Sequence, residues 1–405
     1  DSRVSRGLGD VYKRQTLAIN STNGSAGTIE IVGIGDSDTT GASSTATIGN
    51  TSTGTLTLDG TIYKTGGNQT YVASATGNDS GQNIDITGAA TFTTTNDAVA
   101  FNTSGVDLAN NGTTTINTGT GIGDVSFAGA LESNGGSNDL LVITSGAGDV
   151  TFTGAVGATN ALGGLDVNSS AGDGDITFSS TIGDSGNAGV VGTTAIGGTA
   201  TEDVNLAGLI YSFDGGTTIT AADGDNIKLT GTGDVTFTTA ADNIEFATGH
   251  IHLADGSNLV VDTGALLGNI TIAEIAGTSV ETVTLDAGTG TTSVGPIGSG
   301  TEIGDLSIGS DANGGITLNG AIVTDGTVLI DGPVTLATGA VSVTTANDTI
   351  TFNHTINGTQ TLTLESGSAA IKLDGAIGGT GILTGLSVNA TDGSTGTIEI
   401  SDIGD

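Results

Sequence analysis

Short runs of alternating apolar and polar residues recur along most of the chain. The run Val125-x-Phe127 is followed by Leu131, so that the third apolar residue lies six after the first. Similar runs begin at Leu56, Val150, Ile176, Val204, Ile316 and Ile371. Apolar residues at positions i and i+2 form one buried face of a strand, because successive side chains point to opposite sides. No segment shows the spacing and caps of a helix, so the pattern predicts an all-β protein.

A second spacing joins these runs into a repeating unit. Val156 is followed nine residues later by Leu165-x-Val167. Successive units begin at Val125, Val150 and Ile176, which are 25 and 26 residues apart. Self-similarity at this period is typical of solenoids. We therefore expect a right-handed parallel β-helix with rungs of about 25 residues. The alternative is a string of immunoglobulin-like β-sandwiches, which needs antiparallel strands in blocks of about 100 residues.

Stacked rungs place equivalent residues one above another. The three aromatic rings of Phe127, Phe152 and Phe178 are then predicted to form a ladder inside the core, and Val125, Val150 and Ile176 a second ladder beside it. A glycine often stands two residues before the last apolar residue of a run, where we expect a bend. The glycines at this place are Gly129, Gly154, Gly208, Gly320 and Gly375.

Longer repeats are superimposed on the rungs. Residues 386–405, LSVNATDGSTGTIEISDIGD, match residues 17–36, LAINSTNGSAGTIEIVGIGD, at 13 of 20 positions and 369 residues apart. Residues 16–405 are thus interpreted as one long repeat plus the start of the next, within a longer parent protein. A further phrase, T-T-x-x-D-x-[IV]-x-F, occurs around Asp97, Asp242 and Asp348.

The first fifteen residues differ in composition from the rest. DSRVSRGLGDVYKRQ holds four of the seven basic residues and resembles translated sequencing-adapter sequence. Residues 1–15 are therefore predicted to be a non-native leader that packs poorly against the fold. The whole chain has a formal net charge of −36, which argues against nucleic acid and anionic lipid as partners. It has no cysteine, and no apolar run approaches the ~20 residues of a membrane helix.

Acidic residues mark the start of several rungs. Asp124, Asp149 and Asp175 each precede the first apolar residue of a rung, and Asp234 holds the same place in GTGDVTF. If the rungs stack, the first three carboxylates form a column at roughly 5 Å intervals. Such columns are candidate Ca²⁺ sites, because calcium takes carboxylate and carbonyl oxygens. The alternative is that each carboxylate accepts hydrogen bonds from its own turn and points into water.

Histidines give a weaker indication of metal binding. His250-x-His252 has a strand spacing, so both rings share one face, and with Asp255 or Glu245 they could hold zinc or copper. The alternative is two exposed histidines flanking a buried Ile251. His354 stands alone in FNHTIN and is expected at an exposed loop position.

Two other functional classes have some support in the sequence. Paired aspartates could carry out glycoside hydrolysis, but no pair is singled out among the 43 acidic residues. Ice or mineral binding needs outward Thr-x-Thr ladders. Thr151-x-Thr153 fits this pattern, but its neighbours read Ser126-x-Ala128 and Thr177-x-Ser179. The ladder is broken, so neither class is preferred.

The phrases GDVTFTGAV (148–156) and GNQTY (67–71), with rungs rich in Gly, Thr, Asn and Asp, resemble the repeat regions of giant bacterial surface proteins. These include filamentous-haemagglutinin-like adhesins and autotransporter passenger domains, and the resemblance covers residues 16–405. It implies a non-enzymatic, extracellular, adhesin-type stalk or fibre segment at the bacterial cell surface. The expected partner is an unidentified receptor or carbohydrate, with self-association of rods as a further expectation. The main alternative is a purely structural surface-layer or spacer element.

Overall fold

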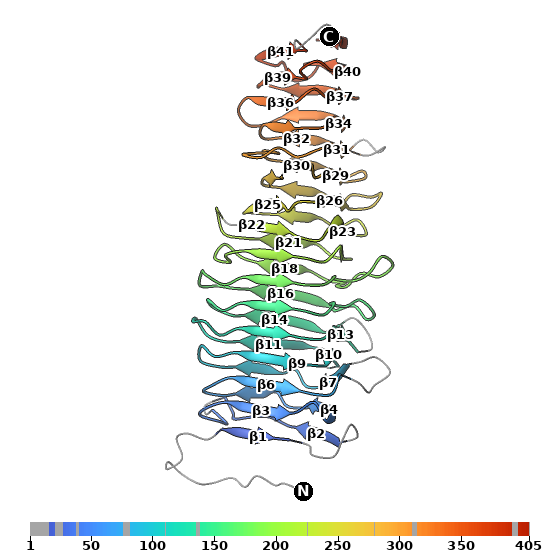
Figure 1. Ribbon diagram of the computed structural model, residues 1–405. Coiled ribbons are helices and arrows are strands. Elements are labelled where there is room, and N and C mark those ends of the chain that lie inside the picture. Colours follow the sequence, from blue (N-terminus) through green and yellow to red (C-terminus); the bar gives the residue numbers. More distant parts are fainter. Residues whose placement is uncertain are drawn as a thin grey trace.

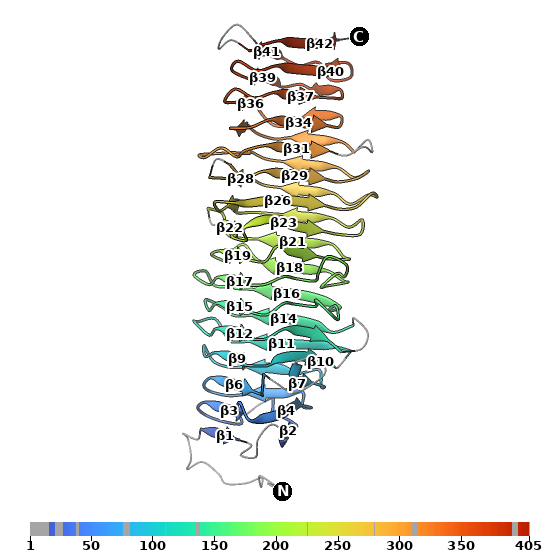
Figure 2. The ribbon, with the colours of Figure 1, turned by 45° about the vertical axis from the view of Figure 1, so that its right-hand side comes forward.

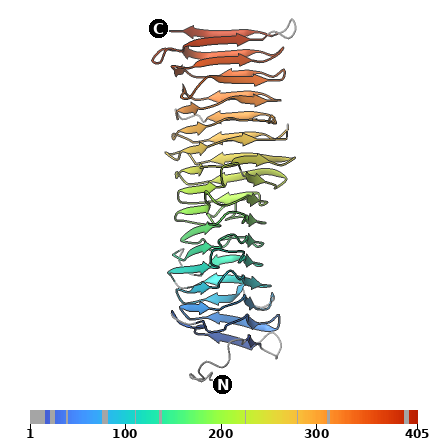
Figure 3. The ribbon, with the colours of Figure 1, turned by 90° about the vertical axis from the view of Figure 1, so that its left-hand side faces the viewer.

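The computed structural model describes residues 16–20, 27–37, 40–75, 82–109, 111–134, 138–224, 226–278, 280–309, 314–390 and 396–404. These residues form a rod of stacked turns, with the two ends of the chain at opposite ends of the rod (Figure 1). The strands lie across the rod one above another (Figure 2), and the stack continues from one end to the other (Figure 3). The prediction for residues 1–15 lies outside the described residues.

Each turn of the chain contributes strands to three faces, which we call the first, second and third face. The first face consists of β1 (Leu17–Ile19), β3 (Ala46–Gly49), β6 (Gln69–Val72), β9 (Val99–Asn102), β12 (Val125–Phe127), β15 (Val150–Phe152), β17 (Ile176–Phe178), β19 (Val204–Leu206), β22 (Asn226–Leu229), β25 (His250–Leu253), β28 (Ile275–Ala276), β33 (Ile322–Thr324), β36 (Val341–Thr345), β39 (Thr361–Glu365) and β41 (Gly385–Asn389). Single parallel bridges through Ile297 join β28 to β33.

The second face follows the first in each turn. It consists of β2 (Gly27–Ile31), β4 (Thr53–Leu58), β7 (Gln82–Ile86), β10 (Gly105–Leu108), β13 (Leu131–Ser133), β20 (Ile210–Ser212), β23 (Gly233–Thr238), β26 (Ser257–Asp262), β29 (Val283–Asp286), β31 (Leu306–Gly309), β34 (Val328–Asp331), β37 (Ile350–Phe352), β40 (Ile371–Ile377) and β42 (Ile398–Ile403). Bridges through Val156 and Ile182 carry this face from β13 to β20.

The third face completes the turn. It consists of β5 (Ile62–Lys64), β8 (Thr91–Thr93), β11 (Thr113–Asn117), β14 (Leu140–Thr144), β16 (Gly164–Asn168), β18 (Thr194–Gly197), β21 (Thr217–Thr220), β24 (Ile244–Phe246), β27 (Ile270–Ile272), β30 (Thr292–Val294), β32 (Ile316–Leu318), β35 (Val334–Leu336) and β38 (Ile356–Gly358). At the C-terminal end, β40 and β42 are long enough to turn the corner, so that Ile377 pairs with both Ile356 and Ile403.

The predicted parallel β-helix is confirmed. The structure is all-β, with about 15 turns of about 24 residues and no helix in its described part. Neighbouring strands pair in parallel throughout, which excludes the immunoglobulin-like alternative because a sandwich is built from antiparallel strands.

The predicted core ladders are also confirmed. Val125, Val150 and Ile176 are register partners on successive turns, and all three are buried. The Phe127 ring lies 5.1 Å from that of Phe152, and the Phe152 ring lies 4.6 Å from that of Phe178, with the planes nearly parallel. The stack extends towards the N-terminus through Phe101 and Tyr71. Parallel stacking follows from the register, because each ring stands directly over the equivalent ring of the preceding turn.

The expected bend is present at Gly129, Gly154 and Gly320. A second constraint also requires a glycine there. A Cβ added at Gly154 would lie 2.3 Å from the carbonyl carbon of Gly129, and one added at Gly129 would lie 2.4 Å from the nitrogen of Gly105. Neither glycine has a positive φ. At this corner the backbones of successive turns approach too closely for any side chain.

The long repeat returns to the same faces. Leu17 and Leu386 lie in β1 and β41 of the first face, and Ile29 and Ile398 lie in β2 and β42 of the second. Followed from turn to turn, the register aligns Leu17 with Val388. The repeat of 369 residues is therefore fifteen turns with a shift of two residues along the strands.

The phrase T-T-x-x-D-x-[IV]-x-F occupies a different corner of the rod each time. Asp97 lies between the third and first faces, Asp242 between the second and third, and Asp348 between the first and second. The turn chemistry is the same at all three corners, because the hydroxyl of the second threonine donates to the carbonyl of the aspartate. The donors are Thr94, Thr239 and Thr345. The phrase therefore specifies a type of turn that can form the corner between any two successive faces.

Candidate functional site

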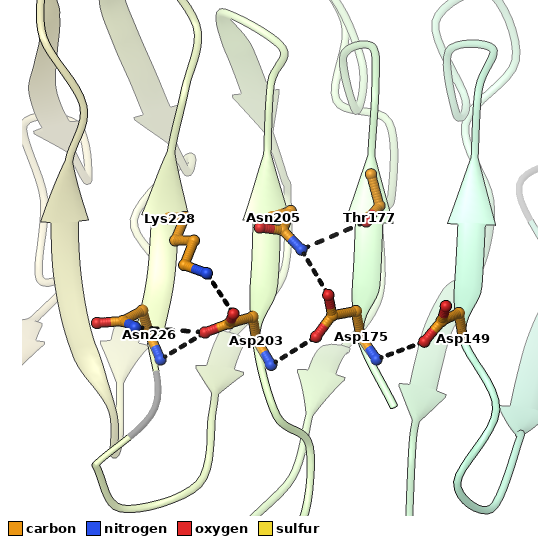
Figure 4. A network of polar contacts seen from close by, with 7 residues as sticks. All are labelled: Asp149, Asp175, Thr177, Asp203, Asn205, Asn226 and Lys228. Carbon is orange, nitrogen blue, oxygen red and sulfur yellow. Dashed lines mark hydrogen bonds and ion pairs between the residues drawn. The ribbon is translucent and has the colours of Figure 1, made fainter. Parts of the chain in front are cut away.

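The predicted acidic column exists on the first face and is longer than expected. Asp124, Asp149, Asp175 and Asp203 stand at the starts of successive strands (β12, β15, β17 and β19), and the last three are drawn in Figure 4. Asp203 was missed in the sequence, although it precedes Val204 as the other three precede their own first apolar residues. An aspartate directly before the first apolar residue of a run therefore marks all four members of the column.

Each carboxylate in the column accepts a hydrogen bond from the next turn. The backbone N–H of Asp149 donates to Oδ1 of Asp124 (3.0 Å), that of Asp175 to Asp149 (2.9 Å), and that of Asp203 to Asp175 (3.1 Å). The backbone N–H of Asn226 continues the series by donating to Asp203 at 3.0 Å. The expectation that each aspartate accepts hydrogen bonds from its own turn is therefore wrong for these contacts. Each carboxylate instead accepts a hydrogen bond from the backbone of the next turn.

The C-terminal end of the column is neutralised by a lysine. Nζ of Lys228, on β22, forms an ion pair with Oδ2 of Asp203, and this hydrogen bond holds the pKa of the ammonium above its usual value (Figure 4). Nδ2 of Asn205 lies 3.4 Å from Oδ2 of Asp175. The column is therefore charge-balanced at this end only, and Asp124 and Asp149 are exposed to water.

Asp234 belongs to a different part of the rod. It lies on β23 in the second face, where Nδ2 of Asn258 donates to its Oδ1 at 2.8 Å. Oδ1 of Asn258 in turn accepts the backbone N–H of Thr282 at 2.9 Å. Asp234 resembles the column residues in sequence because an aspartate before an apolar-x-apolar run marks the start of a strand on any face.

Side chain-to-backbone ladders of this kind recur at other corners. Oδ1 of Asn243 accepts the N–H of Asn269 at 2.9 Å, and Oδ1 of Asn269 accepts that of Thr291 at 2.8 Å. Oδ1 of Asp305 accepts the N–H of Thr327 at 2.7 Å. Asn and Asp serve alike, so the contact needs an oxygen acceptor and not a negative charge. This indicates a structural role for these residues in joining successive turns.

The histidines are placed on a strand as predicted, but without the partners expected from sequence. Both His250 and His252 lie on β25 and flank the buried Ile251. Nε2 of His250 is 3.6 Å from Oε2 of Glu274, whereas Glu245 lies on β24 of the third face. Among the residues that the structure describes, no group of three or more His, Cys, Asp or Glu is arranged to hold a metal ion.

His354 is also near a carboxylate. Its Nε2 lies 3.3 Å from Oδ1 of Asp331, on the neighbouring turn. The side chain of His354 is 43% exposed, so this pair is solvated and of small energetic weight.

The threonine ladder is mixed in the structure, as the sequence predicts. Thr151 has Ser126 and Thr177 as register partners, and the column continues through Asn205 to Lys228. A regular array of threonines of the kind that an ice-binding surface requires is not formed along this column.

One cleft of about 560 Å³ lies at the corner between the second and third faces, where Asn160, Asn187, Phe213, Asp214 and Thr239 contribute to its walls. Asp214 is its one carboxylate among the described lining residues. Glycoside hydrolysis ordinarily requires a pair of carboxyl groups across the scissile bond. The cleft therefore gives no support to a hydrolase.

These features define the chain as a β-solenoid repeat protein whose polar residues mainly join successive turns. No protein-family model matches the chain, and no curated protein and no solved structure matches it. The described residues include no helix of the length and apolarity needed to cross a membrane.

Proposed function

We propose that residues 16–405 are a non-catalytic stalk or fibre segment of an extracellular bacterial surface adhesin. The observation that carries the proposal is the uninterrupted stacking of about 15 turns around one continuous core. At a strand spacing of about 4.8 Å, this stack is a rod roughly 70 Å long. Such a rod holds whatever is attached to its end at a fixed distance from its base.

The rung-to-rung contacts support a load-bearing role. Successive turns are joined by parallel ladders or single parallel bridges on three faces, and by side chain-to-backbone bonds such as that from Asp175 to Asp149. Pulling along the rod would have to break many of these bonds together. The strongly acidic composition, with a formal net charge of −36, keeps neighbouring chains in solution apart.

Rod length can be tested by a deletion that follows the register. Val125 and Ile251 are separated by five turns on the first face, so joining Asp124 directly to Ile251 keeps the faces aligned. Negative-stain electron microscopy should show a straight rod that shortens by roughly 24 Å in the deletion variant, given the strand spacing. An irregular particle, or a deletion variant of unchanged length, would contradict the proposal.

A second measurement separates the stalk from its main alternatives. Beads coated with the purified segment are tested for binding to a glycan array and to cultured cells. A stalk or spacer gives no saturable binding, whereas a segment that is itself adhesive gives a saturable signal. In the parent protein displayed on cells, the five-turn deletion should reduce adhesion if the segment is a stalk, and leave adhesion unchanged if it is only a surface-layer element.

A further inference from the structure

A second acidic column lies on the second face, and two of its three members, Asp107 and Glu132, are buried. Asp107 on β10 has two register partners, Asp85 on β7 and Glu132 on β13. The strand spacing places these three residues about 4.8 Å apart along the rod. Asp107 is 9% exposed and Glu132 is 2% exposed, although both side chains point away from the core of the rod.

Three described residues, Ser133, Asn134 and Asp139, lie beside this column. The backbone N–H of Asn134 donates to the carbonyl of Leu108 at 2.7 Å. Asp139, itself 1% exposed, accepts hydrogen bonds from the hydroxyl of Ser133 (2.5 Å) and the N–H of Asn111 (2.7 Å). These contacts hold Ser133, Asn134 and Asp139 beside the end of β10, which contains Asp107.

Glu132 and Asp107 differ in the hydrogen bonds that the described residues give them. Glu132 accepts the backbone N–H groups of Thr159 (3.1 Å) and Asn160 (2.7 Å). The carboxyl group of Asp107 accepts no hydrogen bond from the described residues. The charged groups that act on it from the neighbouring elements are Asp85, Glu132 and Asp139, and all three are carboxylates.

We propose that Asp85, Asp107 and Glu132 form a pH-responsive element, which tightens the turns from β7 to β13 when the surroundings become mildly acidic. When Asp107 takes up a proton, its carboxyl group becomes an O–H donor between two carboxylates. A hydrogen bond to Asp85 or Glu132 then replaces the repulsion of like charges. The contacts of Ser133, Asn134 and Asp139 at the ends of β10 and β13 are held more firmly in that state, and more loosely when Asp107 is ionised.

The direction of the pH dependence follows from the pKa shifts. Burial, followed by the charges of Asp85, Glu132 and Asp139, raises the pKa of Asp107 to about 6, and burial also raises the pKa values of Asp85 and Glu132. A raised pKa means that the folded state binds protons more tightly than the unfolded state. The stability that this contributes is fully present below the ordinary pKa of 3.8 and is lost as the pH rises through about 6.

Hydrogen exchange read by mass spectrometry tests this on the intact chain. The opening constant of peptides covering Gly105–Leu108 should be up to about tenfold smaller at about pH 5 than at about pH 7.5, after correction for intrinsic exchange. Asp107→Asn should abolish this difference, whereas Asp124→Asn, in the exposed column, should retain it. Equal protection of the wild-type chain at both pH values would overturn the proposal, as would an Asp107→Asn variant that keeps the difference.

A second variant keeps the test decisive if Asp107→Asn does not fold. Asp85→Asn removes one of the carboxylates that face Asp107 and should move the midpoint of the transition to lower pH. A midpoint that stays in place in Asp85→Asn would show that the column does not act as a coupled unit, and would overturn the proposal.

Discussion

The backbone N–H of Asp175 donates a 2.9 Å hydrogen bond to Oδ1 of Asp149, which lies one turn earlier in the rod. Like charges about 5 Å apart repel, by about 1 kcal/mol in bulk water. One oxygen of the Asp149 carboxylate accepts this bond, and the same contact in neighbouring turns holds the turns together in spite of the repulsion. The aspartate column therefore links successive turns by hydrogen bonds.

The first prediction separates the acceptor role of Asp149 from its charge. Asp149→Asn keeps an acceptor oxygen and removes one negative charge, so we expect unchanged or slightly increased stability at low salt. Asp149→Ala removes the acceptor and should cost about 1 kcal/mol, the usual net value of one hydrogen bond. Urea unfolding of both variants checks this. Equal destabilisation by Asn and Ala would show that the negative charge is required.

The second prediction concerns calcium. One oxygen of each of Asp124, Asp149 and Asp175 already accepts an N–H group, and the described residues form no metal-binding group of three. We expect the thermal midpoint at fixed ionic strength to be the same with millimolar calcium as with excess chelator, because only general screening acts. A higher midpoint in calcium, which sodium or magnesium chloride of equal ionic strength does not reproduce, would establish the calcium column instead.

The third prediction concerns the aromatic stack. Phe152 is 1% exposed and lies between the rings of Phe127 and Phe178. Phe152→Ala leaves a cavity and should cost about 3–5 kcal/mol. Thr151→Ala is the matched control, because Thr151 points outward from the same strand and is half-buried. Hydrogen exchange along the rod should show the loss of protection centred on β12, β15 and β17. Protection lost equally at both ends would indicate that the whole rod unfolds as one unit.

The fourth prediction concerns the close approach of turns at Gly154. A Cβ there would lie 2.3 Å from the carbonyl carbon of Gly129 and 2.4 Å from the nitrogen of Ala130. Because both contacts are backbone, Gly154→Ala must separate two turns and should clearly lower the thermal midpoint. Gly216→Ala is the control, since nothing lies within 4 Å of its added Cβ and its φ is not positive. Similar midpoints for the two variants would contradict the close packing.

Much of the fold could be predicted from the sequence because a solenoid repeats its local pattern. The positions of Val125, Phe127 and Leu131 within one turn set those of every later turn with the same spacing, so the core ladders followed directly. The same repetition of local pattern is the reason why Asp234 was assigned to the wrong column. Its surroundings read like those of Asp149, but the face on which a run falls depends on the lengths of all preceding loops. A short phrase does not contain that information.

The candidate sites were less predictable. The contact of His250 with Glu274 joins residues 24 apart, and only the register brings them together. The column of Asp85, Asp107 and Glu132 escaped notice because each residue stands alone in sequence, at an outward position that normally faces water. Its surroundings include Asn134 and the backbone of Thr159 and Asn160, which lie in loops that no periodic pattern describes.

The three corners that share the T-T-x-x-D phrase lie at different heights along the rod and between different pairs of faces. Passing from Asp97 to Asp242 and then to Asp348 moves along the axis and turns the phrase by one face each time. The same corner element therefore faces three different directions at three different heights along the rod.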